Sequence, residues 1–342
     1  MMKGRRWRSF RNRSSAALGP TLGVLLGCLC AVPLASGAET RAAEQRAAGM
    51  EAGSATPQTT DFASAMSSTV IFLYAKEGGD PLGTAFVVGY PAPGKANAVV
   101  PLIVTAKHVI ADRALVVARF TGRSGSGPVD VAYDLADLRK SGDLWEHSDE
   151  GVDVVVFRTR TFPQMQPAWI PVDLVADREG FLQEDVKATD RVVFPSLLVN
   201  FAGTSRNYPV VRDGSIALIP DEPIPIQYMV GSKPVSTKQS LILINAASAP
   251  GSSGAPVFLW PGPRSKHGDI FIDGTRPLLL GIMHGHFSAG PRLLIEIGPN
   301  VSVPASEVSS GIAIAFPSWR LREILERNDV KKRIADLAAK EE

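Results

Sequence analysis

Two series of short apolar segments, rich in β-branched residues and separated by turn residues, constrain the fold of this chain most strongly. The first series covers residues 69–75, 83–90, 97–106, 114–120 and 152–159. The second series covers residues 190–195, 208–219, 240–246, 255–260, 278–285 and 311–316. Segments of this length and composition are typical of β-strands. Two sets of about six strands predict an all-β protein with two halves.

The clearest helical pattern lies at residues 318–340. Ser318 is suited to the N-cap of a helix, and apolar residues recur after it at helical spacing. These residues are Leu321, Ile324, Leu325, Ile334 and Leu337. We expect one C-terminal helix that packs on the second half.

The first 38 residues have the pattern of an export signal. A basic stretch precedes an apolar run at residues 16–35, and small residues follow at Ser36 and Ala38. A membrane anchor is the alternative, but Gly and Pro residues interrupt the apolar run. We therefore predict a cleaved signal peptide at residues 1–38 and a periplasmic or extracellular protein.

Residues 39–60 contain almost no large apolar side chain, so we expect a flexible leader there. Residues 25–28 also resemble a bacterial lipoprotein signal, and membrane attachment would require lipidation at Cys28. Both cysteines, Cys28 and Cys30, lie within the predicted signal, so we expect no disulfide in the processed chain.

Charge and composition argue against several classes of protein. The chain has 342 residues with 45% hydrophobic residues, enough for a large core. Its formal net charge is only +2 and basic residues cluster in the first thirteen positions, so we expect no nucleic-acid partner. No Gly-rich phosphate loop or Cys/His cluster occurs, so we predict neither a cofactor nor a metal ion. The oligomeric state stays open.

Three polar residues stand at the edges of predicted core strands. His108 follows one strand, Asp153 opens another, and Ser253 lies in a Gly-Ser-Ser-Gly turn before a third. A serine hydroxyl attacks a carbonyl when a base removes its proton, and an imidazole is the better base when a buried carboxylate orients it. His, Asp and Ser supply these three roles. Asp149 or Glu150 could replace Asp153 as the acid, but the apolar run after Asp153 favours that residue.

Four segments carry a resemblance to a known family. Residues 83–86 (GTAF), 105–108 (TAKH), 153–156 (DVVV) and 251–257 (GSSGAPV) occur in an order that is similar to the trypsin/chymotrypsin-like serine peptidases. The disulfide-free bacterial branch, with the Deg-type periplasmic proteases and the glutamyl endopeptidases, is the most similar. Because only a helix is predicted after Phe316, we expect no PDZ domain after the peptidase-like region.

This resemblance implies two six-stranded antiparallel β-barrels, a chymotrypsin-like double barrel with a C-terminal helix. The peptidase domain would cover residues 61–342, with the first barrel at about 61–175, the second at about 185–316 and the helix at 318–340. The active site would lie between the two barrels.

The resemblance also implies a role for each residue of the candidate site. His108 would be the general base, Asp153 its orienting carboxylate and Ser253 the nucleophile. The backbone N–H groups of Gly251 and Ser253 would form the oxyanion hole. Ser253 is chosen over Ser252 because it alone has the Gly-x-Ser-Gly placement of the family.

Three further residues fall at the expected specificity pocket. Ala247 stands six residues before the nucleophile, where enzymes that cut after Lys or Arg carry an acid. His284 and His286 lie on the strand that should form one wall of the pocket, where a histidine could select an acidic side chain.

The expected function is that of an exported serine endopeptidase that acts on peptides or proteins through an acyl-enzyme. One alternative is an inactive pseudopeptidase that serves as a binding module. The other is an α/β-hydrolase esterase with Ser253, Asp273 and His284, which is disfavoured because a strand rather than a helix is predicted after Ser253.

Overall fold

The computed structural model describes residues 62–96, 98–123, 126–271, 277–288, 294–296, 302–304 and 309–340. The predicted signal peptide and the whole of the predicted leader lie outside these residues, as do Cys28 and Asp273. Among the helices that are described, none is both long enough and apolar enough to cross a lipid bilayer.

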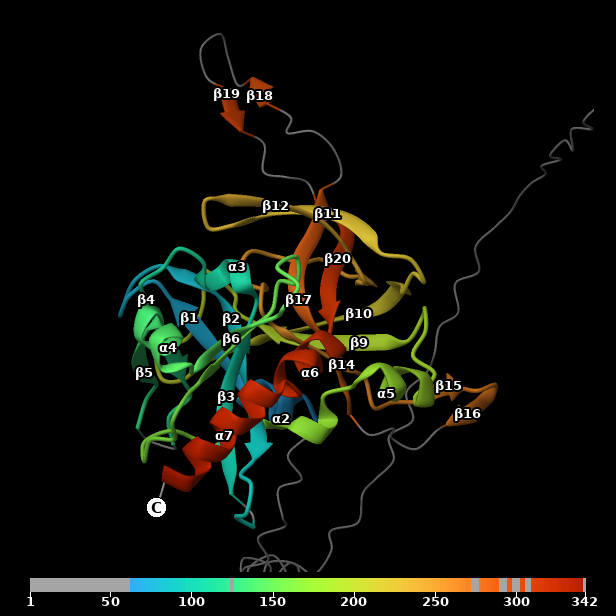
Figure 1. Cartoon of the computed structure of the whole chain (residues 1–342). Helices are drawn as coiled ribbons and strands as arrows, with labels where there is room; N and C mark the ends of the chain where they lie inside the picture. Colours follow the sequence, from blue (N-terminus) through green and yellow to red (C-terminus); the bar gives the residue numbers. More distant parts are fainter. Residues whose placement is uncertain are drawn as a thin grey trace, which may run out of the picture. The chain divides into compact units, whose positions relative to one another are not determined.

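The first half of the described chain forms one eight-stranded sheet (Figure 1). Its strands are β1 (Val70–Tyr74), β2 (Pro81–Pro91), β3 (Val99–Thr105), β4 (Leu115–Phe120), β5 (Val129–Asp134), β6 (Leu144–Glu146), β7 (Val155–Arg158) and β8 (Ile170–Pro171). Seven of them follow the order β5-β4-β1-β2-β3-β7-β6 with antiparallel neighbours, and β8 pairs with β2 in parallel. The sheet does not close by hydrogen bonds within the described residues, so the first of the two predicted barrels is a half-barrel of eight strands instead of six.

The second half forms a closed six-stranded antiparallel barrel in the order β10-β13-β20-β17-β14-β9. Its strands are β9 (Arg191–Ser196), β10 (Val210–Leu218), β13 (Ile242–Asn245), β14 (Pro256–Leu259), β17 (Leu279–Ser288) and β20 (Ser309–Pro317). Each contains one segment of the second predicted series. Closure pairs every strand on both sides, which removes free sheet edges.

Buried clusters of apolar side chains fill each half and join the two halves. One lies within the first sheet and includes Leu73 and Phe157, and another fills the barrel around Phe194. The largest joins the halves, because Phe86 of β2 belongs to the same cluster as Phe316 of β20. Burying a side chain of this kind contributes about 1.5–3 kcal/mol relative to leaving it exposed. The ends of β3 and β7 in the sheet, and of β14 and β17 in the barrel, are therefore held in fixed relative positions.

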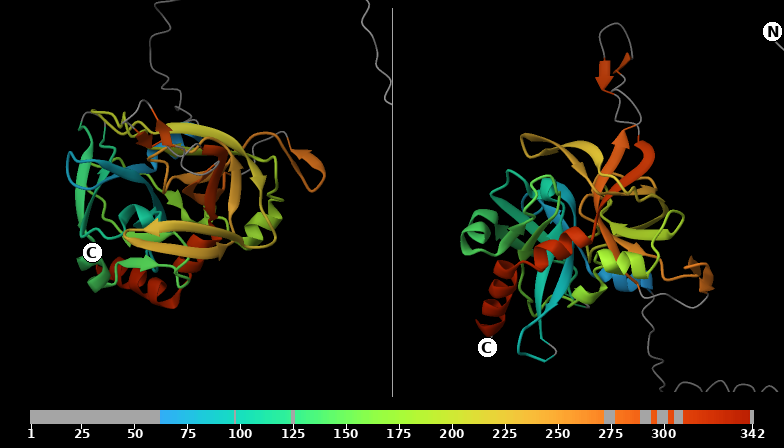
Figure 2. Two further views of the ribbon diagram at one scale, coloured as in Figure 1. Left: turned by 90° about the horizontal axis from the view of Figure 1, so that it is seen from above. Right: turned by 45° about the vertical axis from the view of Figure 1, so that its right-hand side comes forward.

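A two-stranded hairpin that the sequence analysis did not predict connects the halves on another side. It consists of β11 (Ile224–Val230) and β12 (Lys233–Gln239), which are labelled in Figure 1 and drawn in gold in Figure 2. Its tip reaches the first half, where the carboxylate of Asp112 accepts a hydrogen bond of 2.6 Å from the backbone N–H of Ser232.

The C-terminal segment forms two helices, α6 (Trp319–Leu325) and α7 (Asn328–Lys340), instead of the single helix that we expected. The helix is interrupted between Leu325 and Asn328. There the guanidinium of Arg327 donates to the carbonyl of Glu146 (2.7 Å) and to the carboxylate of Asp329 (3.0 Å). The two helices also contact both halves rather than the second alone: α6 packs on β20 and β7, and α7 packs on β3.

Four shorter helices and a 3-10 turn lie in the connections. They are α2 (Phe62–Ser68), α3 (Lys107–Ile110), α4 (Leu135–Ser141), α5 (Arg178–Gln183) and η1 (Val172–Leu174). Two small hairpins complete the described elements: β15 (Arg264–Lys266) with β16 (Asp269–Phe271), and β18 (Leu294–Glu296) with β19 (Ser302–Pro304).

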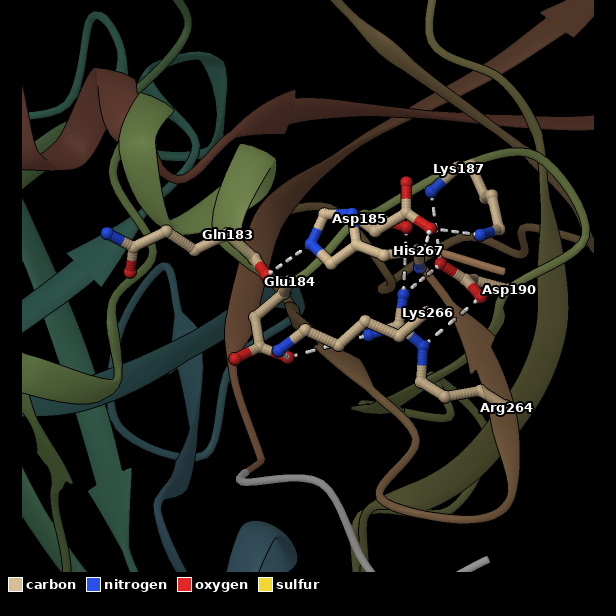
Figure 3. A network of polar contacts seen from close by, with 8 residues as sticks. All are labelled: Gln183, Glu184, Asp185, Lys187, Asp190, Arg264, Lys266 and His267. Carbon is tan, nitrogen blue, oxygen red and sulfur yellow. Dashed lines mark hydrogen bonds and ion pairs between the residues drawn. The ribbon is translucent and has the colours of Figure 1, made fainter. Parts of the chain in front are cut away.

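An ion network with one buried pair fastens the β15–β16 hairpin to the segment before β9 (Figure 3). The guanidinium of Arg264 contacts the carboxylate of Asp190 at 2.6 Å, and their side chains are only 5% and 6% exposed. Lys266 pairs with Glu184 at 3.0 Å, and Asp185 accepts a hydrogen bond from the backbone N–H of His267. The network stabilises one end of the barrel.

The arrangement of an open half-barrel, a closed barrel and C-terminal helices is the chymotrypsin-like double-barrel fold. The antiparallel sheets also exclude the α/β-hydrolase alternative, since Ser253 is followed by the strand β14 and not by a helix.

Candidate active site

His108 lies immediately after the end of β3, in the single helical turn α3. The apolar residues of β3 are buried in the sheet, and the turn carries the imidazole away from it with 24% of its side chain exposed. Its Nδ1 atom lies 2.6 Å from Oδ2 of Asp153, and its backbone N–H donates to Oδ1 of the same carboxylate at 2.8 Å. The structure thus brings His108 and Asp153 together.

Asp153 precedes β7, and its side chain is fully buried. Burial acts to raise the pKa of this carboxyl, but the facing imidazoles of His108 and His284 hold it well below its usual range. Burial likewise acts to lower the pKa of the His108 imidazole, but the charge of Asp153 and its hydrogen bond outweigh this, and the pKa of His108 is raised. Asp149 is bound elsewhere, because its carboxylate accepts hydrogen bonds from Gly151 and Gln239.

Ser253 lies in a sharp turn between two glycines that the geometry requires. Gly251 has φ +92° and Gly254 has φ +84°, in the left-handed region that favours glycine. A Cβ atom on Gly254 would also lie 2.1 Å from the carbonyl oxygen of Thr84. The neighbouring Ser252 is fully buried and its hydroxyl lies 3.4 Å from that of Ser196, whereas Ser253 is partly exposed.

The hydroxyl of Ser253 donates a hydrogen bond to the carbonyl oxygen of His284 at 3.0 Å. It makes no hydrogen bond with His108, although both residues are described. The rings of His108 and His284 are in edge contact, with centroids 5.3 Å apart. Ser253 therefore belongs to the same cluster as His108 and Asp153, and His284 lies between them.

Thr84 of β2 anchors the turn from the opposite half of the molecule. Its hydroxyl donates to the carbonyl of Gly251 at 2.6 Å and accepts from the backbone N–H of Leu197 at 2.9 Å. Its backbone N–H donates to the carbonyl of Ser253 at 2.9 Å, and its own carbonyl accepts from the hydroxyl of Thr105 at 2.8 Å. One fully buried threonine thus fixes two carbonyls of the turn.

The backbone N–H groups of Gly251 and Ser253 make no hydrogen bond to any described residue. Those of the neighbouring Ser252 and Gly254 do, to the carbonyls of Ala249 and Met283. The two uncommitted donors stand in the turn that carries the Ser253 hydroxyl, where a developing oxyanion would need them.

The three predicted pocket residues occupy different environments. Ala247 is exposed, and His286 is half-buried on β17 with a buried Nε2 atom that has no hydrogen-bond partner among the described residues. The imidazole of His284 bonds to Asp153, with its Nδ1 atom 2.6 Å from Oδ2. The side chain of His284 thus contacts the carboxylate that we assigned to His108 alone.

Two residues at this site were missed from the sequence, Thr84 and Tyr228. The ring of Tyr228 packs edge-on against His284 at 4.7 Å, and its hydroxyl donates to the carbonyl of Gly151 at 3.0 Å. Tyr228 lies in β11, along which more and less buried residues alternate. An alternating pattern in the sequence of this segment is the signal that could have revealed the hairpin.

His108, Asp153 and His284 are also a donor set that suits a borderline metal ion, with ligand atoms within 4.8 Å of one another. Tetrahedral zinc at about 2.0–2.1 Å from each ligand separates the ligand atoms by about 3.3 Å. The two N–O distances of 2.6 Å are instead those of charge-assisted hydrogen bonds. In this structure the carboxylate of Asp153 holds both imidazoles by these hydrogen bonds.

Solved structures that resemble this chain include three proteases or protease domains. The MamO protease domain from Magnetospirillum magneticum (apo form) is 12% identical, with a TM-score of 0.43, and the match covers 77% of this chain and 98% of that one. The Rv3671c protease from M. tuberculosis, in its active form, is 15% identical with a TM-score of 0.39, covering 78% and 83%. The HtrA-type protease AlgW with decapeptide is 17% identical with a TM-score of 0.42, covering 77% and 66%.

No protein-family model and no curated protein sequence matches the chain. The assignment of the fold rests on the strand order of the sheet and the barrel. This strand order is that of the chymotrypsin-like double-barrel fold.

Proposed function

We propose that this chain is a serine endopeptidase in which His108, Asp153 and Ser253 act as a catalytic triad. The observation that carries the proposal is the pairing of a fully buried Asp153 with the Nδ1 atom and the backbone N–H of His108, beside a serine turn with two uncommitted N–H groups. A carboxylate in this position holds the Nδ1–H tautomer and leaves Nε2 of the imidazole free to accept a proton.

The reaction would begin when the Ser253 side chain rotates from the carbonyl of His284 toward His108. As Oγ bonds to the carbonyl carbon of a peptide, His108 takes the hydroxyl proton, and the N–H groups of Gly251 and Ser253 bind the oxyanion. The C–N bond then breaks and the amine leaves with the proton from His108. Water, activated by the same imidazole, hydrolyses the ester and restores Ser253.

The test uses a fluorophosphonate probe on the full chain, followed by peptide mapping. We expect one adduct per chain, on Ser253, with no labelling of Ser253→Ala or His108→Ala. Ser252→Ala is the matched control and should still be labelled. A folded wild-type protein that stays unlabelled would overturn the proposal.

One observation favours a second function, that of a binding module. The Ser253 hydroxyl is bonded to the His284 carbonyl and not to His108. If this bond persists when a peptide binds, the turn holds the peptide without cutting it. Binding of a peptide together with absence of labelling would support this second function.

Export of the protein is proposed from the sequence alone. The exported protein would lie in the periplasm or outside the cell. Mass spectrometry of the protein from a bacterial host should find an N-terminus at Glu39. A lipid-modified Cys28 would show membrane attachment instead, and a retained Met1 would contradict export.

A further inference from the structure

Asp153 accepts hydrogen bonds from two imidazoles at the same oxygen atom. Nδ1 of His108 and Nδ1 of His284 each lie 2.6 Å from Oδ2, and Oδ1 accepts the backbone N–H of His108. Each Nδ1 must carry a proton to bond to an ionised carboxylate. One buried negative charge is thus shared between the candidate base and a second histidine.

The ring of His284 is held in this place by its surroundings. Its side chain is 10% exposed, and it packs edge-on against Tyr228 of β11 at 4.7 Å and Phe316 of β20 at 5.5 Å. The titratable groups that face it are Asp153, His108 and Tyr228. Burial and the charges of Asp153 and Asp149 raise the pKa of Tyr228, so its hydroxyl stays neutral.

The backbone of the same residue reaches the candidate nucleophile. The carbonyl oxygen of His284 accepts the Ser253 hydroxyl at 3.0 Å. The residue therefore contacts two of the three proposed triad members, Asp153 through its side chain and Ser253 through its main chain.

We propose that His284 is a positioning residue of the triad, which divides the charge of Asp153 between two imidazoles and so lowers the basicity of His108. This inference rests on the proposed function. A hydrogen bond from His284 to the carboxylate reduces the charge that His108 experiences. Without this second donor, Asp153 would attract the protonated form of His108 more strongly.

Two variants separate this role from simple packing. His284→Leu keeps a side chain of similar bulk but removes the donor. His284→Asn places an amide N–H near the former Nδ1 atom and cannot take up a proton. Because both alter the packing around Tyr228, a purely structural role predicts similar defects in the two.

The first measurement is the pH dependence of kcat/KM for a peptide substrate. In His284→Leu we expect the acid limb to move up by about half to one pH unit, as expected when one hydrogen bond to the carboxylate is lost. His284→Asn should return the limb to within a few tenths of a unit of the wild-type value. The control variant His267→Asn, on the β15–β16 hairpin, should leave the acid limb of the pH profile unchanged. An unmoved limb in His284→Leu would overturn the proposal.

The second measurement does not depend on turnover. Proton NMR of the full chain at low temperature should show two strongly downfield Nδ1–H signals, of which His284→Leu removes one and His108→Ala the other. A single signal, lost only in His108→Ala, would contradict the sharing of Asp153. If wild-type Ser253 resists phosphonate labelling while both signals are present, the proposed function fails and the sharing stands.

Discussion

The hydroxyl of Thr84 lies 2.6 Å from the carbonyl oxygen of Gly251, a residue 167 positions further along the chain. This bond crosses from the first sheet to the turn that carries Ser253. The same hydroxyl accepts the N–H of Leu197, which directly follows β9, so one oxygen atom links the turn to that segment.

Replacing Thr84 by Val should therefore damage activity more than it damages the fold. The variant leaves the buried N–H of Leu197 without a partner, which costs about 1–3 kcal/mol, and removes the donor to the half-buried carbonyl of Gly251. If Gly251 then turns its N–H away from the oxyanion, kcat falls by about 10²–10³. Peptide hydrolysis and urea unfolding measure the two effects, and Thr84→Ser, which keeps the hydroxyl, should restore most of both. Wild-type kcat in Thr84→Val would show that the bond does not position the oxyanion hole.

Asp153→Asn should lower kcat by about four orders of magnitude, the effect known for loss of the orienting carboxylate in a trypsin-type triad. An amide can donate to Nδ1 of His108, which favours the tautomer with the proton on Nε2. That tautomer cannot accept the serine proton. Single-turnover kinetics on an ester substrate would measure the loss. A loss of less than tenfold would mean that another group orients His108.

The raised pKa of His108 sets the sign of two pH effects. The base works only when it is neutral, so kcat/KM should fall tenfold per pH unit below an apparent pKa that lies above the ordinary histidine value of about 6.5. The protonated imidazole bonds best to Asp153, so its contribution to stability is complete below pH of about 6.5 and is lost as the pH rises through the folded-state pKa. Activity and this part of the stability should thus change in opposite directions. An acid limb below pH 6 would contradict the assignment.

Arg264→Met should destabilise the protein by about 3–5 kcal/mol, because it leaves the buried carboxylate of Asp190 without its cationic partner and with only the backbone N–H of Lys187. Chemical denaturation monitored by tryptophan fluorescence would measure this. Removing both charges, in Arg264→Met with Asp190→Leu, should recover much of the loss.

A matched control is Asp213→Ala, which breaks the exposed pair of Asp213 and Arg191. Its cost should stay below about 1 kcal/mol. Equal losses in Arg264→Met and Asp213→Ala would show that burial does not govern the network.

Much of the fold was predictable because burial leaves a local signal. The apolar runs before His108 and after Ser253 correspond to β3 and β14, and Asp153 lies next to β7. The polar residues at the ends of such strands are placed by the sheet and the barrel, so their positions relative to the strands could be predicted.

Features that depend on contacts between distant segments could not be predicted in this way. The orientation of His284 depends on Asp153, 131 residues earlier, and on Tyr228 of the hairpin. The break between α6 and α7 depends on Arg327 reaching the carbonyl of Glu146. Closure of a sheet depends on the pairing of its edge strands, and local periodicity does not report this pairing.

The most direct test of the account is the hydrolysis of a mixed peptide library by the full wild-type chain and by its Ser253→Ala and Ser252→Ala variants, followed by mass spectrometry. We predict cleavage by the wild type and by Ser252→Ala, and none by Ser253→Ala when its circular dichroism spectrum matches that of the wild type. Cleavage by Ser253→Ala at the wild-type rate would contradict the central claim that this hydroxyl is the nucleophile.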